Sequence, residues 1–138
     1  MADDELGPEL RVAVMRLARR LRNERNSDLP VGQLTALATL DRHGPLTPGE
    51  LAEAEHVSPP SMTRVLAALD ARSLVRREAH PTDGRQQVVS ITDEARALLV
   101  ADRARRDAWL TCRLRELGPA ERDALTAAIP VLQTLAGS

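Results

Sequence analysis

The sequence contains no phenylalanine, no tyrosine and a single tryptophan, Trp109, so its core must be built from aliphatic side chains. No apolar run reaches the roughly 18 residues of a membrane-spanning helix, and the acidic N-terminus does not resemble a secretory signal. The one cysteine, Cys112, cannot form a disulfide within the chain, which is typical of a reducing compartment. We therefore expect a single domain over residues 1–138, located in the cytoplasm and without a membrane partner.

Lysine is also absent, and all nineteen basic residues are arginine. The formal net charge is −1, but it is unevenly distributed along the chain. Residues 1–57 hold seven arginines and ten acids, a net of −3, whereas residues 58–92 hold five arginines and three acids, a net of +2. A phosphate-binding surface needs a local positive potential rather than a basic whole protein. The charge pattern therefore permits a nucleic-acid partner for residues 58–92.

Apolar residues recur at helical spacing near the N-terminus. One helix is predicted from about Pro8 to Arg25 and a second from about Val31 to Arg42. The first carries a single apolar stripe, made of Leu10, Val14, Leu17 and Leu21.

The segment Thr47-Pro48-Gly49-Glu50 has the pattern of a capping box and predicts the start of a short helix. This helix should end near His56, where a residue with positive φ would suit the turn.

Ser58 is predicted to cap the next helix, whose apolar face is formed by Met62, Val65, Leu66 and Leu69. The opposite face of this helix carries no bulky apolar side chain. It presents Pro60, Ser61, Thr63, Arg64, Ala67 and Ala68. Such a surface suits a helix that enters the DNA major groove, although an ordinary solvated face fits this pattern equally well.

Two strands are predicted next, over Leu74–Ala79 and Gln86–Ile91, with Val89 and Ile91 on one face of the second strand. Asp83-Gly84 supplies the turn chemistry of a β-hairpin. Arg85 is the residue we expect to enter a DNA minor groove, while Asp83 braces a neighbouring arginine. The predicted fold class is mainly α with a small β-hairpin wing, a winged helix-turn-helix over residues 31–92.

These motifs resemble the MarR (multiple antibiotic resistance regulator) family of bacterial transcription factors. The wing pattern of Asp83, Arg85, Val89, Ile91 and Thr92 carries most of the resemblance, together with the recognition-helix start at Ser58, Ser61, Thr63 and Arg64. His56, Ser73 and Ala95 stand where the family usually has glycine. The DNA-contacting residues implied here are Ser58, Pro60, Ser61, Thr63, Arg64, Asp83, Arg85 and Gln86.

The resemblance also implies a homodimer that binds a pseudo-palindromic DNA operator and is most often a repressor. The terminal helices, over residues 6–27 and 93–136, would form the dimerisation lobe. The apolar stripes support this, because they exceed what a small monomer core can absorb. A long helix is predicted from Thr92 to Leu117, and Pro130 should kink the last helix or remove one hydrogen bond. The expected interface residues are Leu10, Val14, Leu17, Leu125, Ile129 and Leu132.

A small effector, aromatic or anionic, is expected in a crevice between the two lobes, with Arg16, Arg20 and Thr39 as lining residues. The histidines show no metal-ligand spacing, so neither a metal nor a cofactor is expected. No catalytic set of residues is present, which argues against an enzyme. The alternative is a winged-helix protein-interaction module that does not bind DNA.

Overall fold

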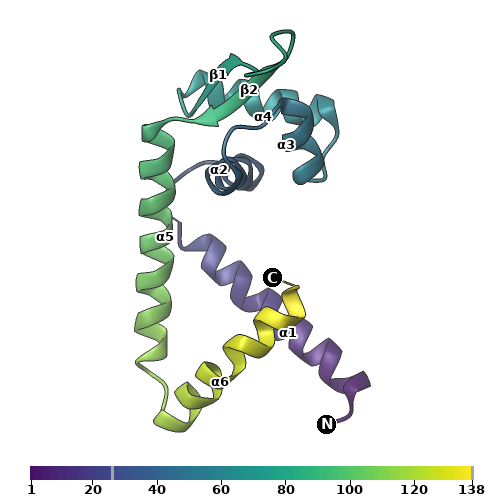
Figure 1. Cartoon of the computed structure of the whole chain (residues 1–138). Coiled ribbons are helices and arrows are strands. Elements are labelled where there is room, and N and C mark those ends of the chain that lie inside the picture. Colours follow the sequence, from purple (N-terminus) through teal and green to yellow (C-terminus); the bar gives the residue numbers. More distant parts are fainter. Residues whose placement is uncertain (26, 138) are drawn as a thin grey trace. The chain divides into compact units, whose positions relative to one another are not determined.

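The computed structural model describes residues 1–25 and 27–137. Figure 1 shows a chain of helices interrupted by one β-hairpin, which confirms the predicted fold class. The elements are α1 (Asp3–Asn23), α2 (Val31–His43), α3 (Pro48–Ala54), α4 (Pro59–Ala71), β1 (Val75–Ala79), β2 (Gln87–Ile91), α5 (Asp93–Leu114) and α6 (Pro119–Ala136). They divide into two compact units, Met1–Arg25 with Ala104–Ser138, and Asn26–Arg103, of which the second includes the first half of α5.

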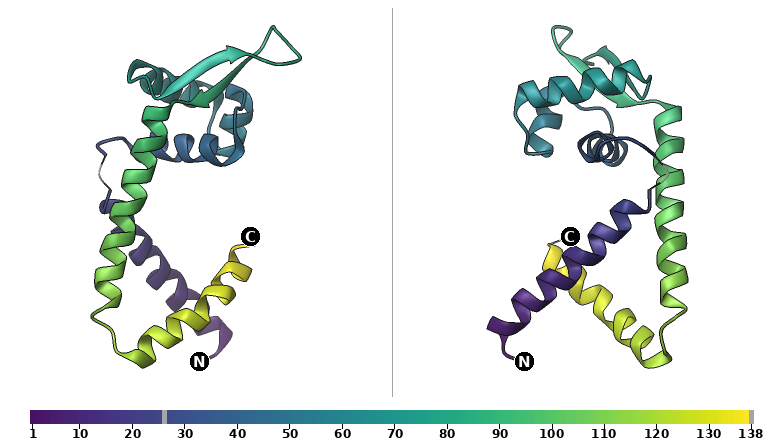
Figure 2. Two further views of the ribbon diagram at one scale, coloured as in Figure 1. Left: turned by 60° about the vertical axis from the view of Figure 1, so that its left-hand side comes forward. Right: turned by 180° about the vertical axis from the view of Figure 1, so that it is seen from behind.

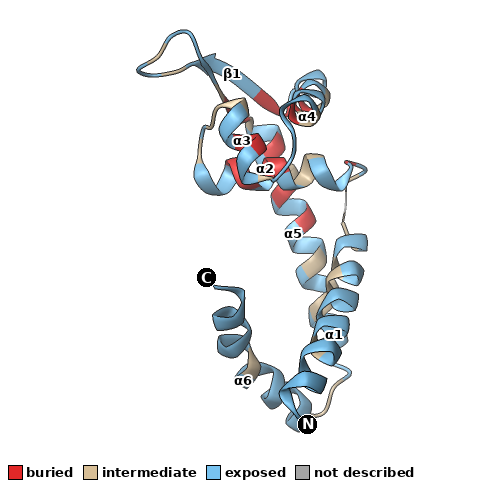
Figure 3. Ribbon diagram, turned by 90° about the vertical axis from the view of Figure 1, so that its right-hand side faces the viewer, coloured by how far each residue is buried: buried red, intermediate tan, exposed pale blue. Residues whose placement is uncertain are grey.

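The second unit contains the hydrophobic core. Figure 3 shows its buried residues on α2, α3, α4, β1 and the beginning of α5. Leu37 of α2, Leu51 of α3 and Leu69 of α4 are completely inaccessible to solvent, as is Val89 of β2. Aliphatic side chains thus fill the core, as the absence of phenylalanine and tyrosine requires.

The pair of helices α3 and α4 is held by local caps at both starts. The predicted capping box is confirmed, because Thr47 Oγ1 accepts from the Glu50 amide at 3.1 Å and Glu50 Oε1 accepts from the Thr47 amide at 3.0 Å. His56 has a φ of 55° in the turn between the helices, as the sequence predicted. Ser58 then caps α4 by accepting from the Ser61 amide at 3.3 Å.

The hairpin alternates as predicted, with Val89 and Ile91 buried beneath it. Its strands are antiparallel, with Val75 opposite Ile91 and Ala79 opposite Gln87. Leu46, just before α3, exchanges both backbone hydrogen bonds with Val89 and thereby joins the helix pair to the hairpin.

The tip of the hairpin contains a turn at Asp83-Gly84, as the sequence predicted, with Asp83 as its first residue. The Gln86 amide donates to the Asp83 carbonyl at 3.0 Å, so Gly84 and Arg85 occupy the centre of the turn. Gly84 does not have the positive φ that a turn centred on Asp-Gly would need. The reason is that Asp83 serves as the first residue of the turn, where an Asp side chain is favoured. The loop projects away from the helices of its unit in both views of Figure 2.

The first unit contains α1, the second half of α5, and α6. None of the residues of α1 or α6, all of which the structure describes, is buried. The predicted start of α1 at Pro8 is wrong, because the helix begins at Asp3 with three acidic residues in its first turn that favour a helix N-terminus. The predicted end of α5 at Leu117 is three residues too late, and α6 runs through Pro130 to Ala136.

Candidate nucleic-acid interface

The outward face of α4 carries the short polar side chains that the sequence predicts. Pro60, Thr63 and Arg64 are exposed and Ser61 is half-buried. The Ser58 hydroxyl donates to Ser61 Oγ at 3.0 Å, and the Thr63 hydroxyl donates to the Pro59 carbonyl at 3.0 Å. These local bonds leave the Ser61 hydroxyl proton and the Arg64 guanidinium as donors that can reach outward.

The wing presents Arg85 at its tip. The Arg85 side chain is 92% exposed, and its Nε donates to Asp83 Oδ1 at 3.3 Å. The same carboxylate oxygen also accepts from the Arg85 amide at 3.2 Å. Asp83 therefore braces the neighbouring arginine, as the sequence predicted. Gln86 is exposed beside it and closes the turn through its amide.

Further exposed arginines lie on β1, at Arg76 and Arg77, on the strand that packs beside α4. With Arg64 and Arg85 they give this part of the second unit four exposed guanidinium groups. No ion pair of the described residues involves Arg64, Arg76 or Arg77. These guanidinium groups agree with the net positive charge counted over residues 58–92, which permits a nucleic-acid partner.

Sequence reasoning missed two residues that hold this unit together, His80 and Asp102. The His80 ring caps the wing loop, because its Nδ1 accepts from the backbone amides of Thr82 and Asp83. Asp102 is 2% exposed and accepts from the Ser27 hydroxyl at 2.9 Å, which joins α5 to the segment before α2. Its spacing of seven residues from buried Ala95 would have indicated that it lies on the inward face of α5.

The pKa of the Glu50 carboxyl departs clearly from its ordinary value. The hydrogen bonds from the backbone and side chain of Thr47 lower the pKa of the Glu50 carboxyl, and the electrostatic influence of His80 lowers it further. The small desolvation of the carboxyl acts in the opposite direction. The cause is thus the helix cap, and the pKa shift does not by itself indicate a reactive group.

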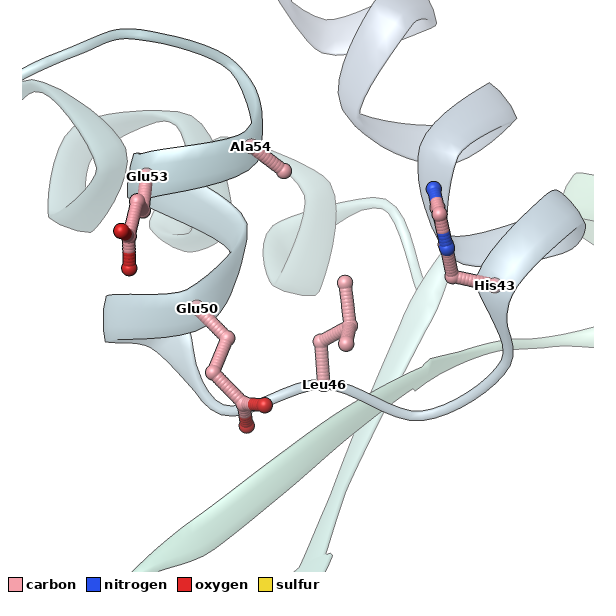
Figure 4. A pocket seen from close by; sticks show the side chains of 5 residues that line it. All are labelled: His43, Leu46, Glu50, Glu53 and Ala54. Carbon is pink, nitrogen blue, oxygen red and sulfur yellow. The ribbon is translucent and has the colours of Figure 1, made fainter.

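The hollow in Figure 4, of about 330 Å³, lies between the end of α2 and α3. It is lined by His43, Leu46, Glu50, Glu53 and Ala54. The carboxylates lie on α3 and the imidazole lies across Leu46 from them, and they do not converge on one point in this view. Among the residues that the structure describes, no group of three or more His, Cys, Asp or Glu side chains could hold a metal ion. No helix within residues 1–25 or 27–137 is long and apolar enough to cross a membrane.

The residues expected around an effector lie in different units. Arg16 and Arg20 are exposed on α1, whereas Thr39 is 4% exposed within the core of the second unit. The burial of Thr39 leaves its hydroxyl inaccessible to a ligand in this conformation. Arg20 instead lies over the ring of Trp109, 5.2 Å from its centroid, and Arg113 lies 5.7 Å from the same centroid. An aromatic ring flanked by two guanidinium groups is a favourable cation–π arrangement.

The predicted interface residues lie on the helices of the first unit. Leu10 is half-buried, and the other five are between 40% and 54% exposed. These five residues are Val14 and Leu17 on α1, and Leu125, Ile129 and Leu132 on α6.

The α3–α4 pair followed by the β1–β2 hairpin defines the second unit as a winged helix-turn-helix, the fold class of many transcription factors. The family model described as MarR family matches residues 29–86. An HTH-type transcriptional regulator of Mycobacterium tuberculosis is 46% identical over 136 residues, covering 97% of this chain and 94% of the relative.

Solved structures agree with this assignment. A crystal structure from Pseudomonas aeruginosa, described as a transcriptional regulator, has a TM-score of 0.87 at 38% identity, over 97% of this chain and 95% of that one. A mutant of MepR from S. aureus, bound to an oligodeoxyribonucleotide, shares the fold with a TM-score of 0.72 at 18% identity, over 94% and 96% of the two chains. The chain belongs to the MarR family and is a transcriptional regulator of the MarR type rather than an enzyme.

Proposed function

We propose that the chain regulates transcription by binding operator DNA with α4 and the wing. The observation that carries the proposal is the set of exposed arginines on α4, β1 and the wing tip, namely Arg64, Arg76, Arg77 and Arg85. Ser61 and Arg64 near the start of α4 would read base edges in a major groove. Arg85 would enter the adjacent minor groove, whose negative potential attracts a guanidinium group. Residues 31–92 would thus form the DNA-binding lobe.

We further propose that the chain acts as a homodimer through its terminal helices, over residues 6–27 and 93–136. In support, α1 and α6 bury no residue of their own while Leu17, Ile129 and Leu132 remain 40–54% exposed. Long helices with unburied apolar side chains need another surface to cover them. A twofold axis would place two copies of α4 in successive grooves of a pseudo-palindromic operator.

The dimer has a direct test. Ile129→Asp places a charge on the apolar face of α6 and should shift the protein toward monomer in sedimentation velocity runs. Val31→Asp is the matched control, since Val31 is an apolar residue of similar exposure, 48%, on α2 in the second unit and outside the proposed dimerisation helices. An Ile129→Asp protein that sediments like the wild type would remove α6 from the interface.

We infer repression, because a dimer seated on promoter DNA would exclude polymerase from the same site. A small aromatic or anionic effector would release it by favouring a spacing of the two α4 helices that misfits successive grooves. The guanidinium group of Arg20, which lies over Trp109, and that of Arg16 on the same helix suit an anionic aromatic ligand. Titration with benzoate-type carboxylates, followed by Trp109 fluorescence and by release of bound DNA, tests this step. Failure of Arg20→Ala to alter an observed response would exclude Arg20 from the effector site.

DNA binding itself is tested by titrating a fluorescent duplex of mixed sequence at increasing salt. Neutralising six to ten phosphates predicts an affinity loss of about 10³-fold to 10⁵-fold between 50 and 200 mM salt. A protein without measurable duplex affinity at low salt would instead favour the alternative, a winged-helix module that binds other proteins.

A further inference from the structure

The wing loop contains a histidine whose ring is used as a hydrogen-bond acceptor. His80 follows β1 directly, and its backbone amide donates to the Gln86 carbonyl at 3.0 Å, closing the base of the loop. Its Nδ1 accepts from the backbone amides of Thr82 at 3.2 Å and Asp83 at 3.0 Å. The Thr82 hydroxyl lies 3.3 Å from the same nitrogen.

This arrangement defines the state of the ring. Two backbone N–H groups point at Nδ1, so that nitrogen must carry the lone pair and the proton must lie on Nε2. The charged groups around the ring are Glu50 at the start of α3, which interacts with His80 electrostatically, and Asp83 and Arg85 in the loop. The ring is half-buried, whereas Thr82 and Arg85 are exposed.

A continuous set of hydrogen bonds leads from the ring to Arg85. His80 fixes the amide of Asp83, and Asp83 Oδ1 accepts from both the amide and the Nε of Arg85, at 3.2 and 3.3 Å. The Asp83 carbonyl accepts from the Gln86 amide, which completes the turn. The side chain of Arg85 is 92% exposed, and its orientation depends on the Asp83 carboxylate. The His80 ring in turn fixes the backbone of Asp83.

We propose that His80 is the positioning residue of the wing, and that its unprotonated Nδ1 preorganises Arg85 for DNA. This rests on the proposed function, because the wing must contact DNA for the positioning to matter. A preordered loop loses less conformational entropy on binding than a loop that must be ordered by the DNA. Asparagine can accept from backbone amides two residues further on, as in an Asx turn, whereas leucine cannot. His80→Asn and His80→Leu therefore separate the hydrogen bond from the volume of the side chain.

The test uses the full chain and the duplex that wild-type protein enriches from a random pool. His80→Asn should bind that duplex within about threefold of wild type, and His80→Leu should lose about tenfold, which corresponds to roughly 1.4 kcal/mol. Combined with Arg85→Ala, His80→Leu should add little further loss, because both changes remove the same interaction. Wild-type affinity in His80→Leu, or a fully additive double variant, would overturn the proposal.

Measurements on the free protein, without DNA, test the role of His80 separately from the proposed DNA-binding function. Nitrogen-15 spectra of the histidine rings in the free protein at pH 8 should show His80 as the Nε2-protonated form, and hydrogen exchange at Thr82 and Asp83 should accelerate in His80→Leu. A proton on Nδ1, or unchanged exchange, would overturn the role of His80. If these signatures are present but no duplex is bound, the DNA-binding function fails while the capping of the loop stands.

Discussion

Replacing Arg85 with alanine should weaken DNA binding without destabilising the protein. The side chain is 92% exposed and its ion pair with Asp83 is solvated, and such pairs contribute about 0–1 kcal/mol to stability. Loss of an arginine contact to DNA costs about 1–3 kcal/mol, which is roughly 5-fold to 160-fold in affinity. A dimer would lose two minor-groove guanidinium groups, so binding should release fewer counterions and the slope of log affinity against log salt should become shallower by about 2.

The assay is fluorescence anisotropy of an enriched duplex at three salt concentrations, paired with thermal unfolding. Arg115→Ala is the control, because it removes one charge from an exposed position just beyond α5 in the other unit. Unchanged affinity and slope in Arg85→Ala would exclude the wing from binding. An equal loss in Arg115→Ala would show that net charge, and no specific contact, is responsible.

Three further predictions concern stability. Ser73 has a φ of 58°, and the strain of a non-glycine residue in this left-handed region exceeds the entropic cost of glycine. Ser73→Gly should therefore raise the free energy of unfolding, measured in urea, by about 0.5–1 kcal/mol. A loss of stability would contradict this. The pKa of Glu50 is lowered in the folded state, so its ionised carboxylate stabilises the fold at pH values above the ordinary glutamate pKa of about 4.3, and this stabilisation is lost as the pH falls through the folded pKa. Glu50→Gln should therefore flatten the dependence of the free energy of unfolding on pH in that acidic range. An unaltered pH profile would argue against this role of Glu50. Leu66 is 1% exposed, and Leu66→Ala should lower the free energy of unfolding by about 2–5 kcal/mol. A loss below about 1 kcal/mol would mean that neighbouring side chains fill the cavity left by the substitution.

Local patterns in the sequence predicted much of the DNA-binding unit. Thr47 and Glu50 form their capping box, and Val89 and Ile91 face the core because side chains alternate along a strand. His56 and Ser73, both interpreted as substitutes for glycine, are the non-glycine residues with positive φ in the part of the chain that the structure describes. Each of these features, the helix cap, the strand alternation and the positive φ, is determined by residues that lie within a few positions of it in the sequence.

Features that depend on competing local interactions were predicted less well. Pro8 looked like a helix start, yet the acids at residues 3–5 extend α1 beyond it. Asp83-Gly84 indicated a turn, but the sequence did not predict that Gly84 and Arg85 would occupy its centre or that the His80 ring would cap the loop. Asp102 accepts a hydrogen bond from Ser27, 75 residues away, and no local pattern identifies that partner.

Sequencing the duplexes that the purified chain selects from a random pool tests the central claim most directly. Two copies of α4 related by a twofold axis predict an enriched pseudo-palindrome, with half-sites centred about 10 base pairs apart or at a multiple of that spacing. Bound protein should contain two chains per duplex. Failure to enrich any sequence, or a single asymmetric site occupied by one chain, would contradict a regulator that reads successive grooves with α4 and the wing.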